Sequence, residues 1–99
     1  MKTKEDFIHE INVLAINTEA NIRNFSTKVV DEQTLHQFYD RCLDQFYKFM
    51  PCYCFMLPFN HLSEKEMLEI NQFGLDKSRE LHKLYSKIYV ERRNAIDAK

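Results

Sequence analysis

The sequence predicts an all-α protein, an antiparallel bundle of three or four helices that forms a single domain over residues 1–99. The first observation is the scarcity of turn residues: the 99 residues include one Gly and two Pro, whereas the tight turns of a sheet protein need both. The second is that apolar residues recur at helical spacing in long runs. With 44% hydrophobic and 29% charged residues, the composition is that of a folded chain.

The first helix is expected from Lys4 to about Phe25. Thr3 is placed to cap it, with Asp6 in the first turn, because an N-cap hydroxyl accepts a hydrogen bond from a backbone N–H of that turn. The side expected to pack into the core follows a 3-4-3-4-3 spacing and consists of Ile8, Ile11, Ala15, Thr18, Ile22 and Phe25. Asparagines occupy much of the opposite side, so this helix is expected to depend on its packing.

A break is expected in the stretch NFSTKVVD, where two adjacent valines disfavour helix and Asp31 offers a new N-cap. The second helix then runs from Glu32 to about Phe49, and we expect Pro51 to end it, because proline disfavours helix in the residue before it and has no N–H to donate. Its apolar side is wide and aromatic and consists of Leu35, Phe38, Tyr39, Cys42, Leu43, Phe46, Tyr47 and Met50.

A third helix is expected after Ser63, which forms a capping-box pattern with Glu66. Its apolar face consists of Met67, Leu68, Ile70 and Phe73. We expect Gly74 to end this helix in a left-handed cap and a fourth helix to run from about Asp76 to Ala95. The alternative is a single long helix, because one heptad phase continues through the glycine and a glycine inside a helix costs only about 1 kcal/mol.

The stretch MPCYCFMLPF at residues 50–59 is the most unusual in the chain. A thiol or metal site would use Cys42, Cys52 and Cys54. A single C-x-C spacing is a weak signal for zinc, and a redox dithiol is favoured when a helix begins after it, whereas here a helix ends before it. We therefore interpret these cysteines as small hydrophobic residues and expect no metal and no cofactor.

The same run is too short to span a membrane, and no basic cluster flanks it. Two interpretations of its apolar side chains stay open. They can belong to a connector threaded across the bundle, or they can stay exposed and bind a protein partner. The anchors of that partner site would be Tyr53, Phe55, Met56 and Leu57. So much apolar surface on a small bundle also makes a homodimer a candidate assembly.

Charge is distributed unevenly along the chain. Residues 77–93 carry six basic and two acidic residues, whereas residues 31–69 carry three basic and seven acidic ones. The four-residue spacing of Arg79, Lys83 and Lys87 places them in one stripe on a helix. We expect this stripe to be solvated or to complement the acidic second helix, within a monomer or across a dimer, and to serve as the charged rim of a partner site. The alternative is a nucleic-acid contact that would add Arg92 and Arg93.

Other function classes are disfavoured. A chain with one Gly cannot form a P-loop or a dinucleotide-binding fingerprint, and it has no nucleophile motif, so no enzyme is expected. The start MKTKEDFIHE has acidic residues where a signal peptide would need an apolar region, and no apolar window is long enough to span a membrane. We therefore expect no secretion signal and no membrane span, and hence a cytoplasmic protein. We expect a small interaction module, an inhibitor, adaptor or regulator that binds and occludes a protein partner's surface. The alternative is a nucleic-acid-binding regulator.

Overall fold

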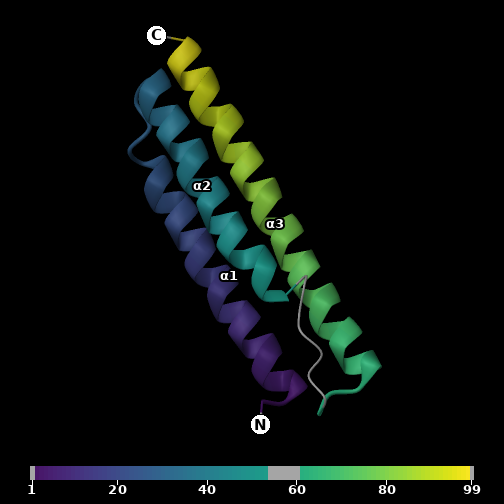
Figure 1. Cartoon of the computed structure of the whole chain (residues 1–99). Helices are drawn as coiled ribbons and strands as arrows, with labels where there is room; N and C mark the ends of the chain where they lie inside the picture. Colours follow the sequence, from purple (N-terminus) through teal and green to yellow (C-terminus); the bar gives the residue numbers. More distant parts are fainter. Residues whose placement is uncertain (1, 54–60, 99) are drawn as a thin grey trace.

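The computed structural model of the chain consists of α-helices that pack side by side (Figure 1). It describes the backbone at residues 2–53 and 61–98, and the side chains at 2–46 and 61–98. The helices are α1 (Lys4–Ser26), α2 (Glu32–Tyr53) and α3 (Glu64–Asp97). The described residues include no strand. The prediction of an all-α fold is confirmed, with three helices.

The molecule is a rod, with extents of 56 × 18 × 16 Å and a radius of gyration of 16.2 Å, against about 13 Å for a compact domain of this size. The two termini lie at opposite ends (Figure 1). Ion pairs join the helices near both ends: Lys4 of α1 binds Glu69 of α3, and Arg93 of α3 binds Glu32 of α2. The surface of such a rod is mostly the outward faces of its helices.

The start of α1 follows the local chemistry that the sequence predicts. Thr3 Oγ1 accepts a hydrogen bond from the Asp6 N–H at 3.2 Å, and Asp6 Oδ2 accepts one from the Thr3 N–H at 2.9 Å. This capping box satisfies two N–H groups that have no partner within the helix. The hydrogen bond from the Thr3 N–H lowers the pKa of the Asp6 carboxyl. The buried side of α1 consists of Phe7, Ile11, Ala15, Thr18, Ile22 and Ser26.

The start of α2 is capped by a reciprocal pair. Asp31 Oδ1 accepts a hydrogen bond from the Thr34 N–H, and Thr34 Oγ1 accepts one from the Asp31 N–H, both at 2.9 Å. The predicted start at Glu32 is confirmed. Four positions of the predicted apolar side are buried: Leu35, Phe38, Cys42 and Phe46.

The end of α2 differs from the prediction, because the helix continues through Pro51 to Tyr53. A proline in the last turn removes one backbone hydrogen bond, and its effect on the preceding residue is a bias against helix that the rest of the turn can override. Tyr39 also differs: it is 39% exposed, at the edge of the apolar side instead of within it.

The expected break at Gly74 is wrong. α3 is one helix of 34 residues, and Gly74 is buried within it without a positive φ. Its start is the predicted capping box, with hydrogen bonds of 3.1 Å between Ser63 and Glu66 in both directions. The helix continues because apolar residues keep the same heptad spacing before and after the glycine. Their packing on both sides of Gly74 outweighs the cost of about 1 kcal/mol of a glycine inside a helix.

Aromatic rings fill the junction of α2 and α3. Phe46 stacks on the His82 ring, with centroids 3.9 Å apart and planes at 17°, and it meets Tyr85 edge-on at 5.9 Å. Phe38 lies 5.5 Å from Tyr85, whose ring lies 5.9 Å from Tyr89. Aromatic pairs at such distances are favourable beyond the area they bury. This ladder of rings is the packing that the wide aromatic side of α2 predicted.

Smaller side chains dominate the buried positions of α1 and of the first half of α3. In α1 the fully buried positions are aliphatic or small, including Ile11 and Ile22 at 0% exposure and Thr18 at 1%. In α3, Gly74 and Ser78 are buried on consecutive turns. Small residues at successive turns allow helix backbones to approach closely. Leu68, which the sequence placed on the apolar face of this helix, is instead 62% exposed.

The contrast between two isoleucines of α1 tests this assignment of the core. Ile11 is fully buried and Ile16 is 58% exposed. We expect Ile11→Ala to lower the free energy of unfolding by about 2–5 kcal/mol, because it leaves a cavity. The matched Ile16→Ala variant should stay within about 0.5 kcal/mol of the parent. Urea denaturation followed by circular dichroism measures both. Equal losses for the two variants would show that the core does not have this composition.

Candidate interaction surfaces

The predicted anchors of the partner site lie outside the described residues. Phe55, Met56 and Leu57 fall in the segment 54–60, and only the backbone of Tyr53 is described, as the last residue of α2. Cys54 and the side chain of Cys52 also lie outside the described residues. The assignment of these residues to a partner site therefore stays a prediction from sequence.

The basic stripe is placed on the exposed side of α3. Arg79, Lys83 and Lys87 are all exposed, and their spacing of four residues brings them to one face over about 12 Å of helix. Arg79 approaches Asp76 at 4.0 Å, a long contact between two exposed side chains. Within the described part of the chain, Lys83 and Lys87 form no ion pair. Most of the positive charge of this stripe is therefore available to a partner.

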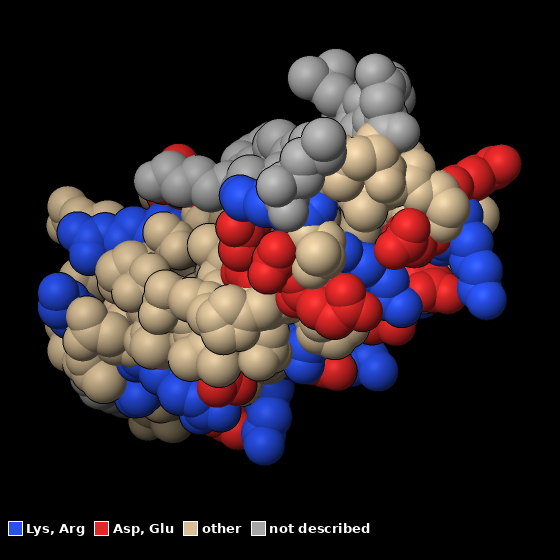
Figure 2. Space-filling view, turned by 90° about the horizontal axis from the view of Figure 1, so that it is seen from below, with Lys and Arg blue, Asp and Glu red and all other residues tan. Residues whose placement is uncertain are grey.

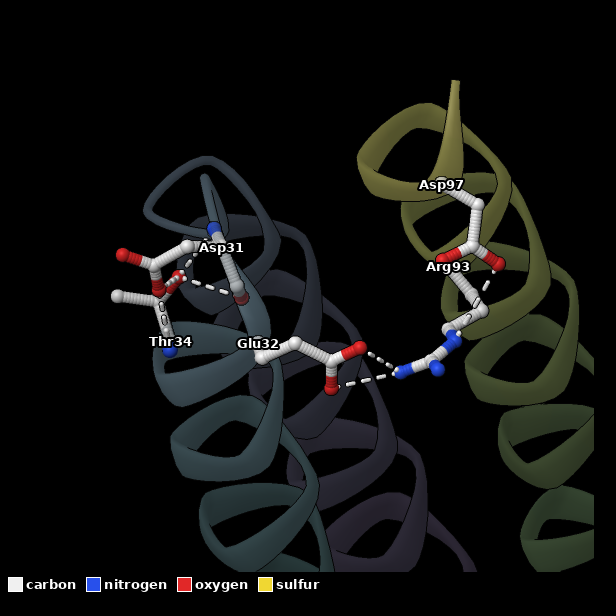
Figure 3. A network of polar contacts seen from close by, with 5 residues as sticks. All are labelled: Asp31, Glu32, Thr34, Arg93 and Asp97. Carbon is white, nitrogen blue, oxygen red and sulfur yellow. Dashed lines mark hydrogen bonds and ion pairs between the residues drawn. The ribbon is translucent and has the colours of Figure 1, made fainter. Parts of the chain in front are cut away.

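The two remaining bases of the nucleic-acid alternative are placed differently. Arg92 is half-buried. Arg93 reaches from α3 to the first turn of α2 (Figure 3), with 2.6 Å between its Nη1 atom and Glu32 Oε1 and 3.5 Å between its Nε atom and Asp97 Oδ2. The hydrogen bond to Glu32 raises the pKa of the Arg93 guanidinium. Arg93 thus joins two helices instead of extending the stripe.

Within the acidic segment 31–69, Glu32 is the residue of α2 that pairs with a base of α3, Arg93. Two other acids of that segment have partners outside the stripe: Asp40 lies 3.5 Å from His36 on its own helix, and Glu69 of α3 binds Lys4 of α1. Hydrogen bonding to the Lys4 ammonium lowers the pKa of the Glu69 carboxyl. Within one chain, the described side chains of α2 therefore form no ion pair with the stripe of Arg79, Lys83 and Lys87.

A second surface, on α1, escaped the sequence analysis. Residues 11–18 contain no charged residue. On the side opposite the core, Val13 is 42% and Ile16 is 58% exposed, and Ala20 follows them as an exposed residue. The signal was present in the spacing of these residues, but the more regular core face of the same helix obscured it. We call His9, Val13, Ile16 and Ala20 the outer seam of α1.

The hollows along the rod are grooves between neighbouring helices. Two of them follow the junction of α1 and α3 and share Asn12 and Lys77. Ile16 lies at one of them and Phe73 at the other.

Burial raises the pKa of two groups in the interior, the buried Cys42 and the half-buried Tyr85. Burial raises the pKa of the Cys42 thiol to about 12, and Cys42 is 0% exposed. Burial is also the main cause that raises the pKa of Tyr85, followed by the nearby Cys42. A buried thiol that keeps its proton is a poor nucleophile. Among the described residues, no three His, Cys, Asp or Glu side chains are grouped so that they could hold a metal ion.

Comparisons of the chain with models of protein families, with curated proteins and with solved structures found no match. In the described part, none of the helices combines the length and the apolar composition needed to cross a bilayer.

The buried thiol predicts a pH dependence of stability. The ordinary thiol pKa is 9.0 and that of folded Cys42 is about 12, so above pH 9 the unfolded state loses this proton first. Stability from this group is complete below pH 9 and is lost as the pH rises toward 12, by at most about 1.4 kcal/mol per pH unit.

Urea denaturation at several pH values between 8 and about 11 measures this loss. We expect the Cys42→Ala variant to lose less stability over this range than the parent, although its stability at pH 8 is lower. The other two cysteines are present in both proteins and cancel in the comparison. Identical pH slopes for parent and variant would contradict the burial of a protonated thiol.

Proposed function

We propose that this chain is an antiparallel three-helix bundle that acts as a non-enzymatic interaction module. It binds an acidic surface of a protein partner through the outward face of α3 and occludes that surface, as an inhibitor, adaptor or regulator does. The observation that carries this proposal is the exposed and mostly unpaired stripe of Arg79, Lys83 and Lys87. Complementary charge across an interface supplies specificity and fast association.

An apolar residue beside the stripe favours a protein partner. Val90 follows Lys87 by three residues, on the same side of α3, and is 55% exposed. An exposed aliphatic side chain contributes to a protein interface, where apolar groups are buried at the centre and charges lie at the rim. The predicted anchors Tyr53, Phe55, Met56 and Leu57 remain part of the proposed interface as predictions from the sequence.

Nucleic acid is the second candidate, and the same unpaired lysines favour it. Arg93 is engaged by Glu32 and Asp97, which leaves three exposed bases in the stripe. Acidic and basic side chains are interspersed over the surface seen in Figure 2, without a large area of one sign. The formal net charge is −1. A contact with about three phosphates would give a shallow salt dependence, so this surface is small for a nucleic-acid site.

Reversing the charge of the stripe tests the proposal. We expect the Lys83→Glu, Lys87→Glu double variant to lose the protein that the parent captures from native lysate, because its carboxylates repel an acidic partner surface. The Lys28→Glu, Lys65→Glu double variant carries the same change in net charge at exposed lysines outside the stripe, and it should capture the partner as the parent does. Pull-downs are run with and without nuclease, and bound proteins are identified by mass spectrometry.

Two outcomes would contradict the proposal. Capture that the stripe variant retains in full would remove α3 from the interface. Recovery of nucleic acid, with loss of every protein after nuclease treatment, would instead favour the second candidate. In that case the logarithm of the affinity should fall linearly with the logarithm of the salt concentration.

A further inference from the structure

The outer seam of α1 has the geometry of a second packing surface. The core positions Ile11, Ala15, Thr18 and Ile22 follow a 4-3-4 spacing and are buried. The seam residues His9, Val13, Ile16 and Ala20 follow the same 4-3-4 spacing, shifted by two residues, and all are exposed. A shift of two residues rotates the position on a helix by about 200°, to the opposite side. α1 therefore carries two helix-packing seams, and the bundle covers only one.

The composition of the outer seam is suited to burial against another helix. None of its residues carries a fixed charge, and residues 11–18 as a whole carry none. Burying an unpaired charge is costly, so interface centres are depleted in charged residues. Glu10 and Glu19 flank the seam, and each already has a cation nearby: Lys2 lies 2.7 Å from Glu10, and Arg23 lies 3.7 Å from Glu19.

The seam is complementary to itself when two copies run in opposite directions. A heptad register then packs Val13 against Ile16 of the second copy, and His9 against Ala20. In the flanking positions of this register, Glu10 faces Asn17 of the second copy and Glu19 faces Asn12, so that each carboxylate meets an amide that can donate a hydrogen bond. In a parallel pairing, Glu5 would face Glu10 of the other copy, and like charges at such positions repel.

We infer that the outer seam of α1 is a homodimer interface, in which two copies of this chain pair their α1 helices in antiparallel orientation. The occupant is a second copy because one register satisfies both the apolar seam and its polar flanks. The 23 residues of α1 are about 34 Å long. Contact along one helix buries less than the roughly 800 Å² per partner of a standard interface. The dimer is therefore expected to dissociate on dilution.

The dimer does not use the basic stripe of α3. Two copies paired through α1 would carry two stripes, and a partner with repeated acidic sites could bind both, which raises its apparent affinity. The inference rests on the exposure and spacing of α1 residues and not on the proposed function. Its test needs no partner, so failure of one proposal leaves the other standing.

Sedimentation equilibrium of the full chain, from about 10 μM to about 1 mM, measures the assembly. We expect a monomer–dimer equilibrium for the parent and a dissociation constant at least about tenfold higher for Ile16→Asp. Leu68→Asp is the matched control, because Leu68 is 62% exposed on α3; it should dimerise like the parent. A parent that stays monomeric throughout, or equal weakening by both variants, would overturn the inference. Circular dichroism establishes that Ile16→Asp stays helical.

Disulfide trapping tests the orientation. Val13→Cys and Ile16→Cys chains are prepared with Cys52 and Cys54 replaced by Ser, while the buried Cys42 is kept, and they are mixed under mild oxidation. Antiparallel pairing predicts that disulfides form between one Val13→Cys chain and one Ile16→Cys chain, more than between identical chains. Cross-links mainly between identical chains would indicate parallel pairing and overturn the proposed register. Absence of cross-links at concentrations where the parent dimerises would place the interface elsewhere.

Discussion

The unbroken apolar phase of α3 is the constraint on which the rest of the structure depends. α3 has 34 residues, whereas α1 and α2 have 23 and 22, and it meets both: the aromatic ladder joins it to α2, and Ile70 and Leu81 belong to the common core. A break at Gly74 would divide α3 into two shorter helices, and neither would pack along the whole length of the rod. Because the helix continues, the ion pairs near its two ends, at Glu69 and Arg93, bind different helices of the same rod.

This architecture separates the groups that stabilise the fold from those that face outward. Buried positions hold aliphatic, aromatic and small residues, and the protonated Cys42 thiol lies among them. The outward faces of α1 and α3 differ in chemistry. The stripe on α3 carries positive charge that is mostly unpaired, and the outer seam of α1 is uncharged and partly apolar. The two contacts that we propose, with a protein partner and with a second copy of the chain, would therefore use different faces.

The helix starts could be predicted because capping is local chemistry. Thr3, Asp31 and Ser63 each lie three residues before a group that reciprocates the hydrogen bond. The continuity of α3 at Gly74 could not be predicted in the same way, because a glycine is compatible with both a helix cap and a helix interior. Packing elsewhere along α3 decides between the two. The exposure of Ile16 was hidden for a related reason. Its spacing is helical, and apolar residues at that spacing have the same pattern whether or not a neighbouring helix covers them.

The continuity of α3 is the central claim, since both the core and the basic stripe depend on it. Nuclear magnetic resonance of the full chain tests it directly, through backbone chemical shifts and amide hydrogen exchange over residues 64–97. The structure predicts helical shifts without interruption and slow exchange of the buried turns on both sides of Gly74. Coil-like shifts with fast exchange at residues 73–76 would show two helices joined by a turn, and would contradict this account.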